Sequence, residues 1–302
     1  MINLLKGLFI GLANIIPGVS GGSFALILGI YTRLIDAIGN LNLKIFIPSR
    51  FRKEFKKADG LFLIQIAAGA VIAIAALARL MDYLLKYRTA PTLSFFAGLI
   101  IASVLIPYSM IGEKKFKNLI YILPGFFAVW GIYTFQEAGP AGPPSLAKLF
   151  ISAAVAVSAM VLPGISGSFV LLILGVYQPV IGHIKSLLSA PAADSLVVLA
   201  VFGLGCIAGL ILFVRIMKIL LHRKRDKTLA FLVGLVAGSL IVLWPFKNYP
   251  DIVSAEKIDI AIITAENIAP ASPAQFFYYL TFFIAGIAGG RALKLLEKKR
   301  DN

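Results

Sequence analysis

Charged residues, cysteine and histidine are all scarce in this sequence of 302 residues. Only 14% of the residues are charged, whereas a soluble domain carries about 25%, so the chain has too few charges to cover a water-facing surface. The single cysteine, Cys206, excludes disulfides and a thiolate metal cluster. The two histidines, His183 and His222, have no acidic cluster of the metal-ligand type nearby. We therefore expect no metal site and no cofactor, with a proton or a sodium ion left open as a coupling ion.

Hydrophobic residues make up 59% of the chain and the mean hydropathy is +0.91. This composition predicts an all-α polytopic protein of the cell membrane. The formal net charge is +15, but the basic residues gather in short loops between apolar runs, where they set topology and contact anionic headgroups. The apolar spans leave no room for a soluble nucleic-acid-binding domain, so nucleic acid is not an expected partner.

One segment of the sequence occurs twice. Residues 13–31, ANIIPGVSGGSFALILGIY, align with residues 159–177, AMVLPGISGSFVLLILGVY, at ten of nineteen positions. A second block, from Arg79 to Ser103, matches the block from Arg215 to Ser239. Two repeated blocks in the same order indicate a duplicated protein.

Each half of the chain, 1–137 and 138–302, is predicted to hold a re-entrant helical hairpin followed by three transmembrane helices. Pro-Gly-Val-Ser-Gly-Gly breaks the first hairpin, because proline and glycine interrupt a helix and turn the chain. Its first arm, about 3–16, is too short to cross about 30 Å of hydrocarbon; its second arm, about 22–38, is expected to be one helix. The predicted elements are a hairpin over 3–38 with spans at about 61–85, 90–112 and 117–135, and a hairpin over 146–187 with spans at about 195–217, 227–247 and 275–295.

Three crossings are an odd number, so the second half must be inverted relative to the first. The basic residues test this independently. With the N-terminus inside, the cytoplasmic segments (Lys6, the loops 40–60, 112–118 and 215–227, and the C-terminus) hold 21 of the 29 Lys and Arg residues. The sequence therefore predicts an inverted-topology repeat with both termini in the cytoplasm. An ordinary bundle of six to eight helices is the alternative.

The two helix breaks are expected to meet near the middle of the membrane. Non-helical backbone at that depth is tolerated only where protein buries it or where it lines a wet cavity. Helix N-termini, serine hydroxyls and glycine backbone together favour an anion, above all phosphate. The predicted binding residues are Asn14, Pro17, Gly18, Ser20, Gly21, Gly22 and Ser23 in the first tip, and Pro163, Gly164, Ser166, Gly167 and Ser168 in the second. Close packing of small residues alone is the alternative interpretation.

Arg79 and Arg215 occupy equivalent positions in the two halves, inside predicted spans. Placing an arginine inside a membrane span costs free energy unless the side chain is paired or has a function. Inversion would place one near each leaflet, where each can hold phosphate bidentately at one mouth of a pathway. The alternative is snorkelling to the interface, with Arg79 paired to Asp82. For Arg33, local pairing with Asp36 is expected rather than a ligand role.

No catalytic constellation stands out in the sequence. Serine without a neighbouring base is a poor nucleophile. The acids within apolar segments, Asp36 and Asp82, each lie beside an arginine. We therefore expect no catalytic residue and no enzymatic activity.

The segments GLANIIPGVSGGSFALILGIY (11–31) and SAMVLPGISGSFVLLILGVY (158–177) resemble the paired signatures of the bacterial polyprenyl-phosphate transporters. The resemblance covers essentially the whole chain, including the stretch GPAGPPS before the second hairpin. It implies a flippase that returns undecaprenyl phosphate, the lipid carrier of cell-wall glycan assembly, from the outer to the cytoplasmic leaflet. Polyprenyl phosphate is then the expected partner. The resemblance leaves the oligomeric state and the chain length of the lipid open.

Two rival functions share these features. A polyprenyl-pyrophosphate phosphatase would use the same lipid, but it should carry a buried acidic or histidine cluster. A carrier of another anion fits the two tips equally well on physical grounds.

A bare phosphate in hydrocarbon meets a large Born penalty. A lipid translocase therefore has to shield only the headgroup, in a groove open sideways to the bilayer, while the isoprenoid tail stays in lipid.

Overall fold

A computed structural model describes residues 2–16, 19–134, 144–189, 193–248 and 265–298. Apart from one pair of two-residue strands, the regular elements of this part of the chain are helices. In chain order they are α1 (Ile2–Ile15), α2 (Gly21–Ile27), α3 (Tyr31–Gly39), η1 (Leu43–Phe46), α4 (Phe51–Lys57), α5 (Gly60–Tyr87), α6 (Thr89–Ser109), α7 (Phe116–Leu119), α8 (Ile122–Thr134), α9 (Leu146–Val161), α10 (Gly167–Ile173), α11 (Tyr177–Ser189), α12 (Ala193–Arg223), α13 (Arg225–Gly238), η2 (Ser239–Ile241), β1 (Lys247–Asn248), β2 (Glu266–Asn267) and α15 (Pro273–Lys298).

Four stretches of the described chain are helical, long and apolar enough to cross a membrane: α5, α6, α7 with α8, and α12. The pair α10 and α11 would add a fifth if its two bent helices form one span. Large apolar side chains stand on the outside of these helices, such as Val71 on α5 and Leu212 on α12, each 65% exposed. Such exposure is unfavourable in water and natural against lipid. The chain is an all-α, multi-pass membrane protein, as the composition predicts.

One predicted span of the second half, 227–247, differs from the structure. The apolar run 227–247 was expected to be one helix, but α13 ends at Gly238 and the 3₁₀ turn η2 follows. Pro245 then prevents the helix from resuming, since proline lacks the amide that a helix interior needs. The last predicted span, 275–295, lies within the single helix α15.

The second arm of each predicted hairpin is broken, which corrects the expectation of one helix per arm. Gly29 and Gly175 adopt positive φ angles of 64° and 70°. After α2, the amide of Ile30 donates to the carbonyl of Ala25, and after α10 the amide of Val176 donates to that of Leu171. These bonds form the glycine-dependent helix stop of the Schellman type. The chain therefore bends by 110° between α10 and α11.

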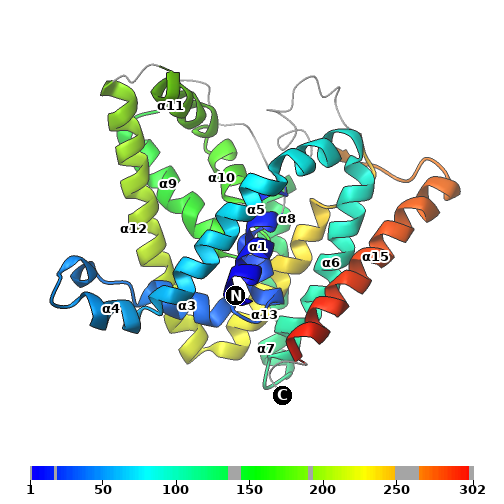
Figure 1. The fold of residues 1–302 in the computed structure, drawn as a ribbon. Coiled ribbons are helices and arrows are strands. Elements are labelled where there is room, and N and C mark those ends of the chain that lie inside the picture. Colours follow the sequence, from blue (N-terminus) through cyan, green and yellow to red (C-terminus); the bar gives the residue numbers. More distant parts are fainter. Residues whose placement is uncertain (1, 17–18, 135–143, 190–192, 249–264, 299–302) are drawn as a thin grey trace.

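Long helices pack in reciprocal pairs. Helix α1 lies along α5 and α9 lies along α12, while α6 packs on α15 and α13 packs on α8 (Figure 1). The last two contacts depend on Gly98 and Gly234, which are equivalent in the two halves. A Cβ at Gly98 would overlap the carbonyl oxygen of Phe283, and one at Gly234 would overlap that of Ile122. The second and third long helices of each half are thus interlocked with those of the other half.

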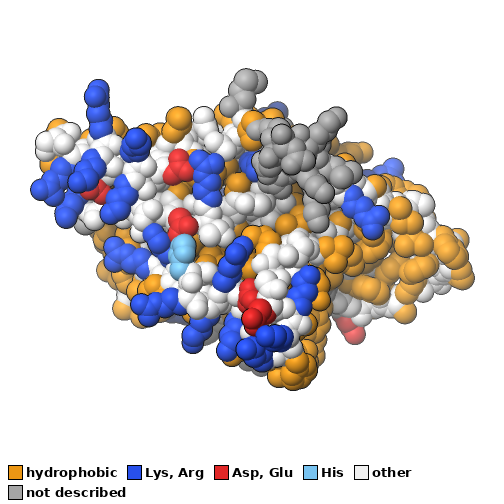
Figure 2. Space-filling model, turned by 90° about the horizontal axis from the view of Figure 1, so that it is seen from below, with side chains coloured by type: hydrophobic (Ala, Val, Ile, Leu, Met, Phe, Trp, Pro, Cys, Tyr) orange, Lys and Arg blue, Asp and Glu red, His pale blue; other side chains and the backbone are white. Residues whose placement is uncertain are grey.

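The basic segments gather at one end of the molecule. Helices α4 and α7 and the α12–α13 connection lie at the lower end in Figure 1, whereas α11 and the α5–α6 connection lie at the upper end. Viewed from below, Lys and Arg side chains spread over this lower face (Figure 2). We call it the basic face.

Ion pairs on the basic face join elements that are distant in sequence. Arg33 pairs with Asp59 at 2.7 Å, so the expectation that Arg33 pairs with Asp36 is wrong. Asp36 instead contacts His222 on α12, with 3.0 Å between Oδ1 and Nε2. The physical reason is that α3 packs against α12, which brings His222 and the ammonium of Lys218, 3.8 Å away, beside Asp36.

Candidate functional site

The first tip connects α1 to α2. Ser20 is the N-cap of α2, and its hydroxyl accepts a hydrogen bond from the amide of Ser23. The side-chain oxygen of Asn14 accepts a hydrogen bond of 2.9 Å from the amide of Gly21, so Asn14 fastens the end of α1 to the start of α2. Its NH2 group has no hydrogen-bond partner among the described residues. The predicted binding residues Pro17 and Gly18 lie outside the described residues.

The second tip connects α9 to α10. Gly164 has a φ of +87°, and a Cβ there would overlap the carbonyl oxygen of Leu235 on α13, so only glycine fits this turn. Ser166 is the N-cap residue of α10, but its side chain makes no cap bond. Its hydroxyl instead lies 2.8 Å from that of Ser168. Since each hydroxyl has one proton, one of this pair is left to donate elsewhere.

The structure brings the two tips into contact. The hydroxyl of Ser20 donates to the carbonyl of Leu162 at 3.0 Å. The amide of Gly164 donates to Ser23 Oγ at 2.9 Å and to Ser20 Oγ at 3.2 Å. Ser20 and Ser23 are 2% and 1% exposed. The first-tip hydroxyls therefore satisfy the backbone of the second tip in this conformation.

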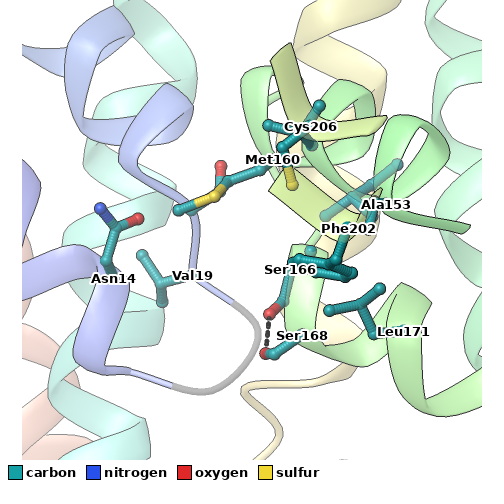
Figure 3. Close-up of a pocket in the computed structure, with 14 residues that line it drawn as sticks. Asn14, Val19, Ala153, Met160, Ser166, Ser168, Leu171, Phe202 and Cys206 are labelled. Atoms are coloured by element: carbon teal, nitrogen blue, oxygen red, sulfur yellow. Dashed lines mark hydrogen bonds between the residues drawn. The ribbon is translucent and has the colours of Figure 1, made fainter. Parts of the chain in front are cut away.

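A pocket of about 310 Å³ lies beside this contact. Asn14 and Val19 lie on one side of it, and Ser166, Ser168 and Leu171 lie on the other (Figure 3). Ser20 reaches the pocket from the first tip and Gly167 from the second.

The remaining wall of the pocket is apolar, and Met160, Phe202 and Cys206 contribute to it. Among the described residues, no charged side chain lines the pocket. The pocket thus offers a few neutral hydrogen-bond donors against an apolar background.

The other predicted tip residues that the structure describes are structural neighbours of the pocket and do not line it. Ser23 and Gly164 form the bond between the tips. Gly22 faces the carbonyl of Val161, so a larger side chain there would push the tips apart. Gly21 and Pro163 complete the two turns and are buried.

Arg79 and Arg215 are exposed on α5 and α12, away from the pocket lining. Each lies eight residues before the end of its helix. The alternative predicted for Arg79 is snorkelling to the interface with an ion pair to Asp82. Within the described chain these two side chains form no ion pair. The structure does not bring the two arginines together with the tips.

Several residues of the site were not found from the sequence. The Tyr31 hydroxyl donates to the carbonyl of Val161 at 3.3 Å, which adds a fourth hydrogen bond between the first half and the second tip. The ring of Tyr133 stacks on Phe169 of α10 with centroids 4.3 Å apart. The identity of Tyr31 with Tyr177 in the repeat was a usable signal for the first of these. No sequence signal marks Tyr133, because α8 is far from the tip in the chain.

Comparison with known proteins decides the family. The undecaprenyl phosphate translocase-like family matches residues 10–259, which contain both tips and the pocket. The chain belongs to this family. No solved structure matches the chain significantly.

Two relatives of this translocase-like chain carry the name polyprenyl-phosphate transporter. The protein of Vibrio cholerae serotype O1 is 37% identical over 297 residues, which cover 94% of this chain and 92% of the relative. The protein of Staphylococcus aureus is 37% identical over 257 residues, covering 81% and 86% of the two chains. The family predicted from the two tip motifs is thereby confirmed, and both relatives are named as transporters rather than enzymes.

Proposed function

We propose that this protein carries undecaprenyl phosphate, or a closely similar polyprenyl phosphate, from the outer to the cytoplasmic leaflet for reuse in cell-wall glycan assembly. The pocket between the tips would hold the phosphate headgroup. The observation that carries the proposal is that donors from both halves converge on one pocket: the Asn14 NH2 group from the first half, and from the second the one hydroxyl proton that the Ser166–Ser168 pair has left over. The names of the two relatives support the same lipid class.

The chemistry of the pocket suits a cargo that must be released. A phosphate has strong acceptor oxygens, and a hydrogen bond to a charged group contributes about 1.5–3 kcal/mol. The amide of Asn14 and one serine hydroxyl supply such bonds without a fixed positive charge. Transport requires binding that is favourable enough to capture the ion and weak enough to release it. The isoprenoid tail needs no polar partner and would stay in the bilayer.

We infer that residues 1–137 and 138–302 form an inverted repeat whose re-entrant hairpins meet at the site, with both termini in the cytoplasm. Three features support this. In both halves three hairpin helices are followed by long helices, although the short helices α4 and α7 occur only in the first half, and both second arms stop at a glycine of positive φ. Lys and Arg side chains spread over the basic face (Figure 2), as the positive-inside rule requires of the cytoplasmic side.

The hydrogen bonds between the tips suggest how the site changes during transport. In the described conformation, Ser20 and Ser23 are occupied by the second tip, while Asn14, Ser166 and Ser168 line the pocket. If the two halves rotate against each other, the Gly164 amide would move away from Ser23 Oγ. A phosphate oxygen would then accept the hydrogen bond that the Ser20 hydroxyl donates to the carbonyl of Leu162 in the described conformation. The headgroup would then contact one tip first and both tips afterwards.

Arg79 and Arg215 fit this scheme as headgroup contacts at opposite mouths of the pathway. Arg79 lies toward the end of α5 that is remote from the basic face, and Arg215 lies toward the end of α12 that reaches it (Figure 1). Each would guide the phosphate to or from the tips. A proton or a sodium ion would drive the cycle.

Proteoliposomes with a fluorescent polyprenyl phosphate test this function. We expect the lipid in the inner and outer leaflets to exchange only when the protein is present, without release of inorganic phosphate. Phosphate release would indicate the phosphatase. If short soluble anions abolish the exchange and the protein shows no preference for the lipid, the protein would be the carrier of another anion.

A further inference from the structure

A second cavity of the molecule combines one cation with an aromatic groove. It has a volume of about 510 Å³ and lies where the end of α5, the start of α6 and the first half of α15 meet. Arg88 stands in its lining, together with Phe95 of α6 and with Tyr278 and Phe282 of α15. Within the described chain, the Arg88 guanidinium has no hydrogen bond or ion pair.

The position of Arg88 sets its depth in the membrane. Arg88 is the residue between α5 and α6, both of which are long and apolar enough to cross the bilayer. The junction of two spans lies at the level of the lipid headgroups. This junction is at the end of the molecule opposite the basic face (Figure 1), so with the proposed orientation it belongs to the outer leaflet.

We propose that this groove is a capture site for the transported lipid in the outer leaflet, separate from the pocket between the tips. The guanidinium of Arg88 would hold the single phosphate, since its planar fork matches phosphate oxygens. The first part of the isoprenoid chain would lie along Phe95, Tyr278 and Phe282. The volume suits one chain beside one headgroup, because pockets for single ligands range from about 300 to 1,000 Å³. This inference rests on the proposed function and adds the place where the lipid is taken up.

The equivalent corner of the other half has the same backbone and different side chains. Lys224 joins α12 to α13 with φ and ψ of −133° and 45°, close to −138° and 37° at Arg88. Lys227 stands there in place of Pro91, with its ammonium 5.2 Å from the centre of the Tyr121 ring. In the groove beside Arg88 the equivalent position is Pro91, which carries no charge. An arginine beside an aromatic groove is therefore a feature of the α5–α6 junction, whereas the equivalent α12–α13 junction carries Lys224.

The test uses the full chain in nanodiscs and a polyprenyl phosphate with a photoreactive group near its headgroup. Labelled residues are located by mass spectrometry. We expect labelling at residues 278–282 as well as at 166–168. Arg88→Gln should reduce the labelling at 278–282 at least about tenfold, the loss expected of one charge-assisted contact, and Phe282→Ala should also reduce it. Lys86→Gln is the matched control, because this neighbouring cation lies over Tyr87 and should leave the labelling unchanged.

The outcomes separate this inference from the proposed function. Labelling of 166–168 without 278–282 would overturn the capture site and leave the transport site standing. Labelling of neither segment would overturn both. Equal competition by phosphatidylglycerol and unlabelled polyprenyl phosphate at 278–282 would reduce the groove to a general contact for acidic lipids and would overturn the capture site. Unchanged labelling in Arg88→Gln would overturn it as well.

Discussion

Ser23 and Gly164 join the two halves of the protein through a buried hydrogen bond of 2.9 Å between the Gly164 amide and Ser23 Oγ. The two residues are 141 positions apart in the chain and each belongs to one tip. This bond means that Ser23 holds the two tips together, in addition to its place among the predicted binding residues.

Ser23→Ala is expected to destabilise the protein, because it leaves the buried Gly164 amide with only the longer bond to Ser20. The loss of one hydrogen bond costs about 0.5–1.5 kcal/mol when the amide keeps a second partner. Thermal unfolding of the purified protein without lipid measures this. Ser158→Ala is the control, since the Ser158 hydroxyl donates to the carbonyl of Ala154 in its own helix and its removal strands no amide. Equal melting temperatures for both variants would contradict the structural role of Ser23.

Replacing Ser166 and Ser168 together by alanine should have the opposite profile. Their hydroxyls bond each other and cap no amide, so stability should change by less than about 1 kcal/mol, the usual effect of a lost cap. Binding of polyprenyl phosphate should weaken about tenfold or more, because a bond to the charged headgroup is lost. Titration with the fluorescent lipid gives the affinity. A large fall in melting temperature at unchanged affinity would favour packing over binding.

Arg79→Gln and Arg215→Gln should each slow transport while the protein remains inserted and folded. The two defects should differ in side, with Arg79 affecting exchange at the outer leaflet and Arg215 at the inner leaflet. Lysine should restore transport only in part, because an ammonium lacks the bidentate fork. If both lysine variants are fully active, the arginines serve as snorkelling anchors.

The orientation of the chain can be checked on described residues. In a background in which Cys206 is serine, a cysteine at Lys86 should react with an impermeant maleimide added to intact cells. A cysteine at Lys224, which joins α12 to α13 in the second half as Arg88 joins α5 to α6 in the first, should stay protected until the membrane is opened. Reaction of both positions from the same side would refute the inverted repeat.

Asp226 on α13 fastens the connection between α6 and α7. The backbone amides of Glu113 and Gly112 hold the pKa of this carboxyl below its ordinary value of 3.8. A depressed pKa means stability that is present above the ordinary value and is lost as the pH falls through the folded-state value. Asp226→Asn should therefore lower the melting temperature at neutral pH, and the difference from the unchanged protein should shrink in acid. A difference that is independent of pH would exclude the carboxylate as its cause.

The sequence is informative about these elements to different degrees. The repeat, the breaks at the two tips and the four long spans follow from local patterns, because apolar length and Pro-Gly pairs act within a few residues. The stops at Gly29 and Gly175 were equally local and were missed, since an apolar run hides a glycine of positive φ. Arg33 was given the wrong partner because the choice between Asp36 and Asp59 depends on how α3 packs.

The pocket itself could be predicted only in part. Asn14, Ser166 and Ser168 belong to the tip motifs and were expected to bind. The bonds of Ser20 and Ser23 to the second tip depend on contacts across more than 140 residues, which no single-sequence pattern specifies. The wall formed by Met160, Phe202 and Cys206 has the composition of any apolar helix and carries no signal of its own.

The most direct test of the account is a cryo-EM structure of the protein in nanodiscs with polyprenyl phosphate. We predict density for the phosphate headgroup in the pocket between the tips, within hydrogen-bond distance of Asn14 and of the Ser166–Ser168 pair, and tail density that leaves the pocket toward the bilayer. A bound lipid whose headgroup lies elsewhere, with the tip pocket empty in every conformation of a transporting sample, would contradict the account.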